Sequence, residues 1–300
     1  MIQYFANREM SRISDIGTDP LENKLFVNER PDEDWDKENI KIQNSTFAKI
    51  GFKESKFELC NLSFCTFIDC YFRYAEFSQV NFTGCVFINC NFERTTISRC
   101  NFQYAIFDNC FIPYSVIRSS LPEERENICA DICKNLSLQC LKLGDTENYR
   151  SFLFRERLAN ERHHWLKMFY RSEVDKKGYY EGFTIIERIE GFLLCAVGKF
   201  SRYLWGYGEK LSVLIRNILL IIGGYALGYE ALLKQTFPSK EFLANIDTSI
   251  YLSVTRFFLV DTDLLCQTSL PLWMMLSENI IGVIIMGFFI AALFRYVNRR

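Results

Sequence analysis

The feature that most constrains the fold is a five-residue period in the first half of the chain. Every fifth residue from Phe47 to Ile117 is apolar, and the residue two places before each of these centres is nearly always small. The centres are Phe47, Phe52, Phe57, Leu62, Phe67, Phe72, Phe77, Phe82, Phe87, Phe92, Ile97, Phe102, Phe107, Ile112 and Ile117. A period of five fits neither the 3.6-residue turn of a helix nor the alternation of a strand. The large and small residues must therefore reach a common interior by another winding.

This pattern resembles the pentapeptide-repeat family, in which each five-residue unit forms one side of a right-handed quadrilateral β-helix. The resemblance implies coils of twenty residues, with residues twenty apart stacked at roughly 4.8 Å. Residues 45–119 then form just under four coils, a rod roughly 18 Å long. Cys70, Cys90 and Cys110 would form one column inside it.

Seven of the twelve cysteines lie within this rod, and they fit its interior better than a chemical site. These seven, from Cys60 to Cys110, fall on multiples of five, which is not the spacing of zinc ligands. The chain opens without an apolar run long enough for a signal peptide, so we expect reduced, intracellular thiols that pack in the core. A redox or metal role is the alternative.

Charge argues against nucleic acid as a partner. The chain has 35 Lys and Arg against 36 Asp and Glu, a net charge of −1. Residues 45–119 carry seven basic and six acidic residues, so the rod lacks the dense negative lattice of a DNA mimic. We expect the rod to be a docking surface or spacer for an unknown protein partner. No phosphate loop, metal cluster or nucleophile constellation is visible, so the sequence predicts no enzyme activity, no cofactor, and no catalytic or metal-binding residue.

Downstream of the rod the pattern becomes helical and then apolar, which predicts a multidomain α+β membrane protein. The segment after residue 182 has an apolar body, an aromatic end and basic residues typical of a helix at a membrane surface, and packing against the preceding helices is the alternative. The predicted segments are an N-terminal cap or arm (1–44), the β-helix (45–119), a helical linker (120–182), an interfacial amphipathic helix (183–210), a first transmembrane helix (211–233), an extracytoplasmic segment with a re-entrant pore loop (234–271) and a second transmembrane helix (272–297).

Basic residues flank the outer ends of both predicted spans. By the positive-inside rule this places the N and C termini in the cytoplasm of a multi-pass protein of the plasma (inner) membrane. These residues are Lys199, Arg202, Lys210 and Arg216 before the first span, and Arg295, Arg299 and Arg300 after the second.

The segment between the spans resembles the pore loop of the two-span potassium-channel superfamily. Members typically read Val-Thr, three residues, then Leu-Gly-Tyr-Gly-Asp. Certain bacterial proteins join pentapeptide repeats to such a module, and the order of segments here is similar to theirs. The resemblance implies a homo-oligomer, a tetramer by analogy, with permeant ions passing a filter. After Val254 the corresponding residues are Thr255, Leu259, Val260, Asp261, Thr262 and Asp263.

The Gly-Tyr-Gly of a potassium filter is missing, so we do not expect potassium selectivity. Val260 and Thr262 are β-branched and favour extended backbone. A carbonyl-lined potassium filter instead needs positive φ values, which glycine tolerates. In a four-fold assembly Asp261 and Asp263 would instead form carboxylate rings, which favour cations weakly through charge. The alternative is that they are solvated loop acids outside the bilayer.

Three residues of the second span complete the candidate site. Glu278 is costly in lipid, so it should face the pore mouth or contact the pore loop. Gly282 and Gly287 allow close helix packing or bending. The resulting hypothesis is an oligomeric, potassium-channel-like cation pore, assembled or gated by the cytoplasmic rod. Its rival is a non-conducting, membrane-anchored scaffold, and a soluble topoisomerase inhibitor fits less well.

Overall fold

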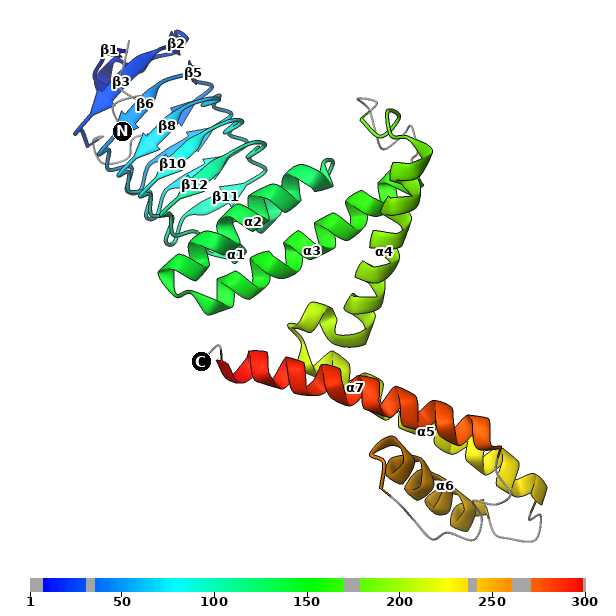
Figure 1. Cartoon of the computed structure of the whole chain (residues 1–300). Helices are drawn as coiled ribbons and strands as arrows, with labels where there is room; N and C mark the ends of the chain where they lie inside the picture. The colour runs from blue at the N-terminus through cyan, green and yellow to red at the C-terminus, as the bar shows by residue number, and fades with distance from the viewer. Residues whose placement is uncertain (1–7, 31–35, 170–178, 237–241, 261–270, 299–300) are drawn as a thin grey trace. The chain divides into compact units, whose positions relative to one another are not determined.

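The computed structural model describes residues 8–30, 36–169, 179–236, 242–260 and 271–298 (Figure 1). The chain forms two compact units, Met1–Ala196 and Val197–Arg300.

The first unit starts with short parallel strands stacked in coils (Figure 1). Phe47 pairs with Phe67 and Phe67 with Phe87, so successive coils are offset by twenty residues, as the repeat predicted. One sheet has the order β1-β3-β6-β8-β10-β12, a second β11-β9-β7-β4, and a third β2-β5. The strands are β1 (Glu9–Met10), β2 (Leu21–Glu22), β3 (Lys24–Val27), β4 (Asp36–Glu38), β5 (Ile42–Gln43), β6 (Thr46–Ala48), β7 (Lys56–Glu58), β8 (Thr66–Ile68), β9 (Glu76–Ser78), β10 (Val86–Ile88), β11 (Thr96–Ser98) and β12 (Ile106–Asp108).

The remaining two sides of each coil are joined by single bridges. Asn61 pairs with Asn81 on one of them, and Tyr71 with Asn91 on the other. Four paired positions therefore recur every twenty residues, which confirms a solenoid of about four turns.

The structure extends the solenoid towards the N-terminus, where the sequence analysis placed a cap or arm (1–44). Strand β3 pairs with β6 so that Phe26 lies opposite Phe47, and their rings stack with centroids 4.8 Å apart. This step is 21 residues rather than twenty, so Phe26 falls outside the five-residue frame. Lys37 stands on the frame but is polar, and its Nζ donates to the Ile16 carbonyl oxygen at 2.8 Å. The regular period therefore does not reveal this first coil.

Columns of stacked phenylalanines fill the solenoid. The Phe67, Phe87 and Phe107 rings follow one another at centroid distances of 5.0 and 5.1 Å, nearly parallel. A neighbouring column contains Phe72 and Phe92, and meets the first edge to face. Both arrangements add to the burial of apolar area.

The described cysteines are free and buried, in agreement with the packing interpretation. Cys90 and Cys110 lie in one column, where the Cys90 amide donates to the Cys110 sulfur at 3.4 Å. In the described part of the chain no cluster of His, Cys, Asp or Glu could hold a metal ion.

Burial predicts unreactive thiols in the solenoid and a stability that falls in alkali. Desolvation raises the pKa of Cys65 from 9.0 to about 12 and that of Cys100 to about 11. Between pH 9 and these values the unfolded chain loses thiol protons that the folded chain keeps, so the free energy of unfolding falls as pH rises above about 9.

We expect a maleimide to label Cys60 to Cys110 only after denaturation, as measured by mass spectrometry of the intact protein. Labelling of these thiols in the native protein at pH 7 would contradict the packing.

Helices close the C-terminal end of the solenoid. They are α1 (Tyr114–Ile117), α2 (Glu126–Leu143) and α3 (Thr146–Met168), with a short 3-10 turn at Arg118–Ser120. Another 3-10 turn, Ile13–Asp15, lies near the N-terminus. Helix α2 covers the last strand, β12: Asn135 Oδ1 accepts from the Phe107 amide at 2.9 Å, and Gln139 Oε1 from the Asn109 amide at 2.8 Å. These side chains pair edge amides that would otherwise be open to another strand. The predicted linker (120–182) thus contributes a cap for the solenoid.

Two partly buried ion pairs to Glu126 join α2 to α3. Glu126 accepts from Arg155 at 3.3 Å and from Arg162 at 3.1 Å, and Gly144 ends α2 in the left-handed conformation, with φ of 73°. Asp145 then caps α3 by accepting from the Asn148 amide. The two helices form a hairpin through this turn (Figure 1).

The second unit is helical. It contains the end of α4 (Ile185–Trp205), a 3-10 turn (Gly206–Gly208), α5 (Leu211–Thr236), α6 (Phe242–Phe257) and α7 (Leu272–Asn298). Leu211–Leu232 and Leu272–Arg295 are long and apolar enough to cross a membrane. Only 11% and 22% of their most apolar windows are buried, whereas the core helix of a soluble protein is mostly buried. Both helices agree with the predicted spans in length and position, and membrane insertion itself stays a prediction.

Candidate functional site

The candidate site is built around α6, a short helix that packs on both long apolar helices. Buried Phe257 of α6 packs in a cluster with Leu214 of α5 and Ile285 of α7. A second cluster joins Leu252 of α6 to Tyr229 of α5. The segment predicted to lie between the two spans is therefore a helix for most of its described length, and its C-terminal half packs on both neighbours.

Polar side chains from all three helices meet at Glu278 of α7, which is completely buried. Its carboxyl group accepts from the Tyr229 hydroxyl of α5 at 2.6 Å and from the Ser253 hydroxyl of α6. The Ser253 hydroxyl also lies 2.9 Å from the Ile222 carbonyl oxygen. The Ser277 hydroxyl, next to Glu278 in the chain, lies 2.9 Å from the Tyr225 hydroxyl of α5. Glu278 thus contacts α6, which lies in the chain between the two apolar helices, and its place at a pore stays a prediction.

Replacing Glu278 tests whether this cluster holds α6. Glu278→Met keeps the volume but leaves the buried Tyr229 hydroxyl without its acceptor, which costs about 1–3 kcal/mol. Glu278→Gln keeps an acceptor for Tyr229 and offers a donor to Ser253, whose own proton can go to Ile222. We expect Met, and not Gln, to speed hydrogen exchange of the α6 amides in detergent.

A compensating variant is the control for the Glu278 substitutions. Adding Tyr229→Phe and Ser253→Ala to Glu278→Met removes the polar groups together, so protection of α6 should recover in part. Equal exchange in Glu278→Met and the unaltered chain would contradict the role of the cluster.

The two glycines of α7 lie in different surroundings. A Cβ added at Gly282 would lie 2.3 Å from the Phe257 carbonyl oxygen, so α6 and α7 touch there through their backbones. A Cβ at Gly287 would meet nothing within 4 Å in the described residues. Close packing therefore accounts for Gly282, and Gly287 has no comparable contact among the described residues.

The C-terminal end of α6 turns sharply at the predicted filter. The Leu259 amide donates to the Arg256 carbonyl oxygen at 3.2 Å and the Val260 amide to that of Thr255 at 2.8 Å. Leu259 is left-handed, with φ of 57°, which completes a Schellman-type helix end without the usual glycine. Thr255 is buried and its hydroxyl donates to the Leu252 carbonyl oxygen, while Leu259 and Val260 are exposed. Asp261, Thr262 and Asp263 lie outside the described residues.

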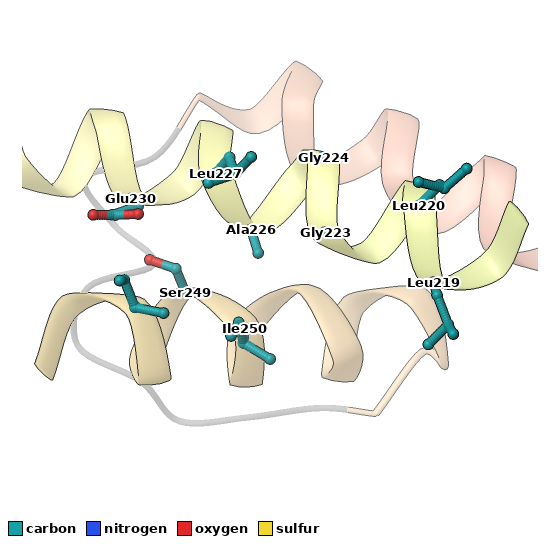
Figure 2. Close-up of a pocket in the computed structure, with 10 residues that line it drawn as sticks. Leu219, Leu220, Gly223, Gly224, Ala226, Leu227, Glu230, Ser249 and Ile250 are labelled. Carbon is teal, nitrogen blue, oxygen red and sulfur yellow. The ribbon is translucent and has the colours of Figure 1, made fainter. Parts of the chain in front are cut away.

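A groove of about 480 Å³ runs between α5 and α6 (Figure 2). Figure 2 shows the Glu230 carboxylate of α5 and the Ser249 hydroxyl of α6 pointing towards one another across it. Its other lining residues are apolar or glycine: Leu219, Leu220, Gly223, Gly224, Ala226, Leu227, Ile246 and Ile250. The lining of the groove is therefore mostly apolar, with a carboxylate contributed by Glu230.

Sequence reasoning missed Tyr229, Ser253 and Glu230. A hydroxyl inside an apolar helix needs a partner when it is buried, so tyrosine and serine in these stretches were the available signal. The hydrogen bonds of Tyr229 and Ser253 to Glu278 join residues on three different helices. The order of residues along the chain does not predict which of them meet.

Comparison with known proteins identifies the repeat. The family model described as pentapeptide repeats (9 copies) matches residues 52–96 and 72–111. The chain therefore carries a pentapeptide-repeat domain. No curated protein matches the chain.

The similar solved structures include forms of QnrB1, a plasmid-mediated fluoroquinolone resistance protein. Two trypsin-treated forms are 20% and 22% identical to this chain, each with a TM-score of 0.17. Each match covers 30% of this chain and, respectively, 44% and 42% of the QnrB1 chain. Full-length QnrB1 is 10% identical, with 34% of this chain covering 71% of that one and a TM-score of 0.12. The chain thus spans less than half the length of the first two.

Proposed function

We propose that the protein is an oligomeric membrane pore for cations, potassium-channel-like in its α5–α6–α7 module and weakly selective. The observation that carries the proposal is the short helix α6, packed against two helices that are apolar enough to span a membrane. The repeat domain, on this proposal, lies in the cytoplasm and assembles or gates the pore through an unknown protein partner.

Electrostatics support passage of cations. The C-terminus of a helix carries a partial negative charge, because its last carbonyl groups have no intrahelical partners. Helix α6 ends at Phe257, and Asp261 and Asp263 follow within six residues. The helix end and the two carboxylates both carry negative charge, so a ring of such units would concentrate cations.

The proposed pore needs several copies of the chain. Three helices cannot enclose a water-filled path, and α5 and α7 present apolar side chains such as Leu219, Leu227 and Ile284 on their exposed surfaces. Lipid and neighbouring subunits would cover these surfaces. Four subunits are proposed by analogy with two-span channels, with both termini in the cytoplasm.

Conductance of the full chain in a planar bilayer tests the proposal. Asp261→Asn combined with Asp263→Asn removes two charges per subunit at nearly constant size, so conductance and cation preference should fall together. The fall should be largest at low ionic strength, since the screening length is about 30 Å at 0.01 M and about 10 Å at 0.1 M. Asp131→Asn, the same change at an exposed position of helix α2, should leave the current unaltered.

The rival is a non-conducting anchor that displays the repeat domain as a scaffold. It predicts no current from the unaltered chain under any ionic condition. A current that the double substitution leaves unchanged would keep a pore but exclude these carboxylates. We expect no nucleic acid partner, enzyme activity or cofactor under either proposal.

A further inference from the structure

Helix α4 has two faces with different surroundings. On one face Gly191 and Cys195 are buried, and a Cβ added at Gly191 would lie 3.1 Å from the His164 carbonyl oxygen and from Lys167 Cβ of α3. The opposite face has six apolar side chains, all between 52% and 79% exposed; the first two are adjacent and the others follow at steps of three or four residues. We call this face the apolar stripe of α4; it consists of Ile185, Ile186, Ile189, Leu193, Val197 and Phe200.

The stripe is too exposed to be explained by packing on α3, and α4 is too charged to cross a bilayer. Contact with α3 uses the side of α4 turned away from the stripe, so α4 packs on the preceding helix and its apolar stripe stays uncovered by the described residues. Charged residues recur along its length, which excludes a transmembrane position for it. They are Glu187, Arg188, Glu190, Lys199 and Arg202.

The connection to α5 limits where the stripe can be. Helix α4 ends at Trp205 and α5 starts at Leu211, so five residues join them. Even fully extended, five residues span only about 18 Å, and three of them form a compact 3-10 turn. If α5 enters a bilayer, the end of α4 must stay near the headgroups of the leaflet in which α5 begins.

Side chains at this end of α4 are of the kinds found at a lipid surface. Trp205 packs edge to face on Phe288 of α7 at 4.8 Å, and the Arg295 guanidinium lies 5.2 Å from the Trp205 ring centroid. Lys199 and Arg202 add positive charge within the last turns of the helix. Tryptophan and basic side chains at the end of such a helix suit a surface of anionic headgroups.

We propose that α4 lies in the headgroup layer of the membrane, with its apolar stripe in anionic lipid and its other face on α3. The membrane surface is thereby joined to the helical hairpin that caps the repeat domain. The inference rests on α5 entering the bilayer and does not depend on conduction.

Added tryptophans in the full chain, reconstituted in vesicles of phosphatidylcholine and phosphatidylglycerol, test this inference. Leu193→Trp places an indole on the stripe, and Leu141→Trp is a matched control on α2, because both leucines are 59% exposed. Leu220→Trp reports on α5. Each added emission is measured against the unaltered chain, with lipids brominated either near the headgroup or near the chain end.

We expect shallow bromines to quench the L193W indole strongly, deep bromines to quench the L220W indole, and neither to quench the L141W indole. Quenching of L220W without L193W would leave membrane insertion intact and overturn the inference, as burial of the stripe against protein predicts. No quenching of either would overturn membrane insertion as well, and with it the proposed pore. Quenching of L193W in a chain that carries no current would support the inference while removing the pore.

Discussion

Replacing Phe87 with alanine is expected to lower the free energy of unfolding of the repeat domain by about 3–5 kcal/mol. The Phe87 side chain is completely buried. Its ring stacks on Phe67 at 5.0 Å and Phe107 at 5.1 Å, and meets Phe92 edge to face at 5.4 Å. Strand pairing fixes the coils above and below, so the walls cannot collapse into the space that the ring leaves. The cost should therefore lie in the upper part of the range for large-to-small substitutions.

Phe64→Ala is the matched control, because it makes the same change at a side chain that is 59% exposed. We expect it to change stability by about 0.5 kcal/mol or less. Hydrogen exchange of the β10 amides in the full chain measures both variants without assuming a single unfolding transition for two units. Similar protection in the two variants would show that Phe87 is not part of a packed column.

The centre of the solenoid was predictable because one constraint repeats there. An inward position every five residues needs a large apolar side chain, and Phe57, Phe82 and Phe102 all occupy such positions and are buried. The first coil was not predictable, because a single extra residue moves Phe26 out of the frame. A pattern-based prediction fails where the geometry continues but the spacing changes.

The helical parts were predictable as helices but not as contacts. Periodicity in residues 126–168 predicts amphipathic helices, yet it does not predict that Asn135 and Gln139 bind the last coil. In the same way, Glu278 was recognisable as a costly charge in an apolar stretch, while Tyr229 and Ser253 were not assigned to it. Each partner is an ordinary residue in its own segment, and only the packing of three helices brings them together.

Replacing Gly282 with alanine is expected to displace α6 and to reduce any current through the protein. The new Cβ would lie 2.3 Å from the Phe257 carbonyl oxygen and 3.1 Å from its carbon, so backbone rather than a flexible side chain has to move. Overpacking of this kind costs about 1–3 kcal/mol, or roughly a 5- to 140-fold loss of exchange protection. Phe257 is the last residue of α6, and the turn at Leu259 and Val260 follows directly. The displacement should therefore be largest at the proposed filter.

Gly287→Ala makes the same change five residues further along α7 and isolates the steric effect. A Cβ there meets nothing within 4 Å in the described residues, and alanine favours a helix over glycine by about 1 kcal/mol. This variant should keep or increase the protection of α7 and leave the exchange of the α6 amides unchanged. If current falls only in Gly282→Ala, the contact between α6 and α7 positions the conducting segment. If both variants lose current while α6 keeps its protection, Gly287 acts in contacts between subunits or in bending of α7, and the position of α6 does not control conduction.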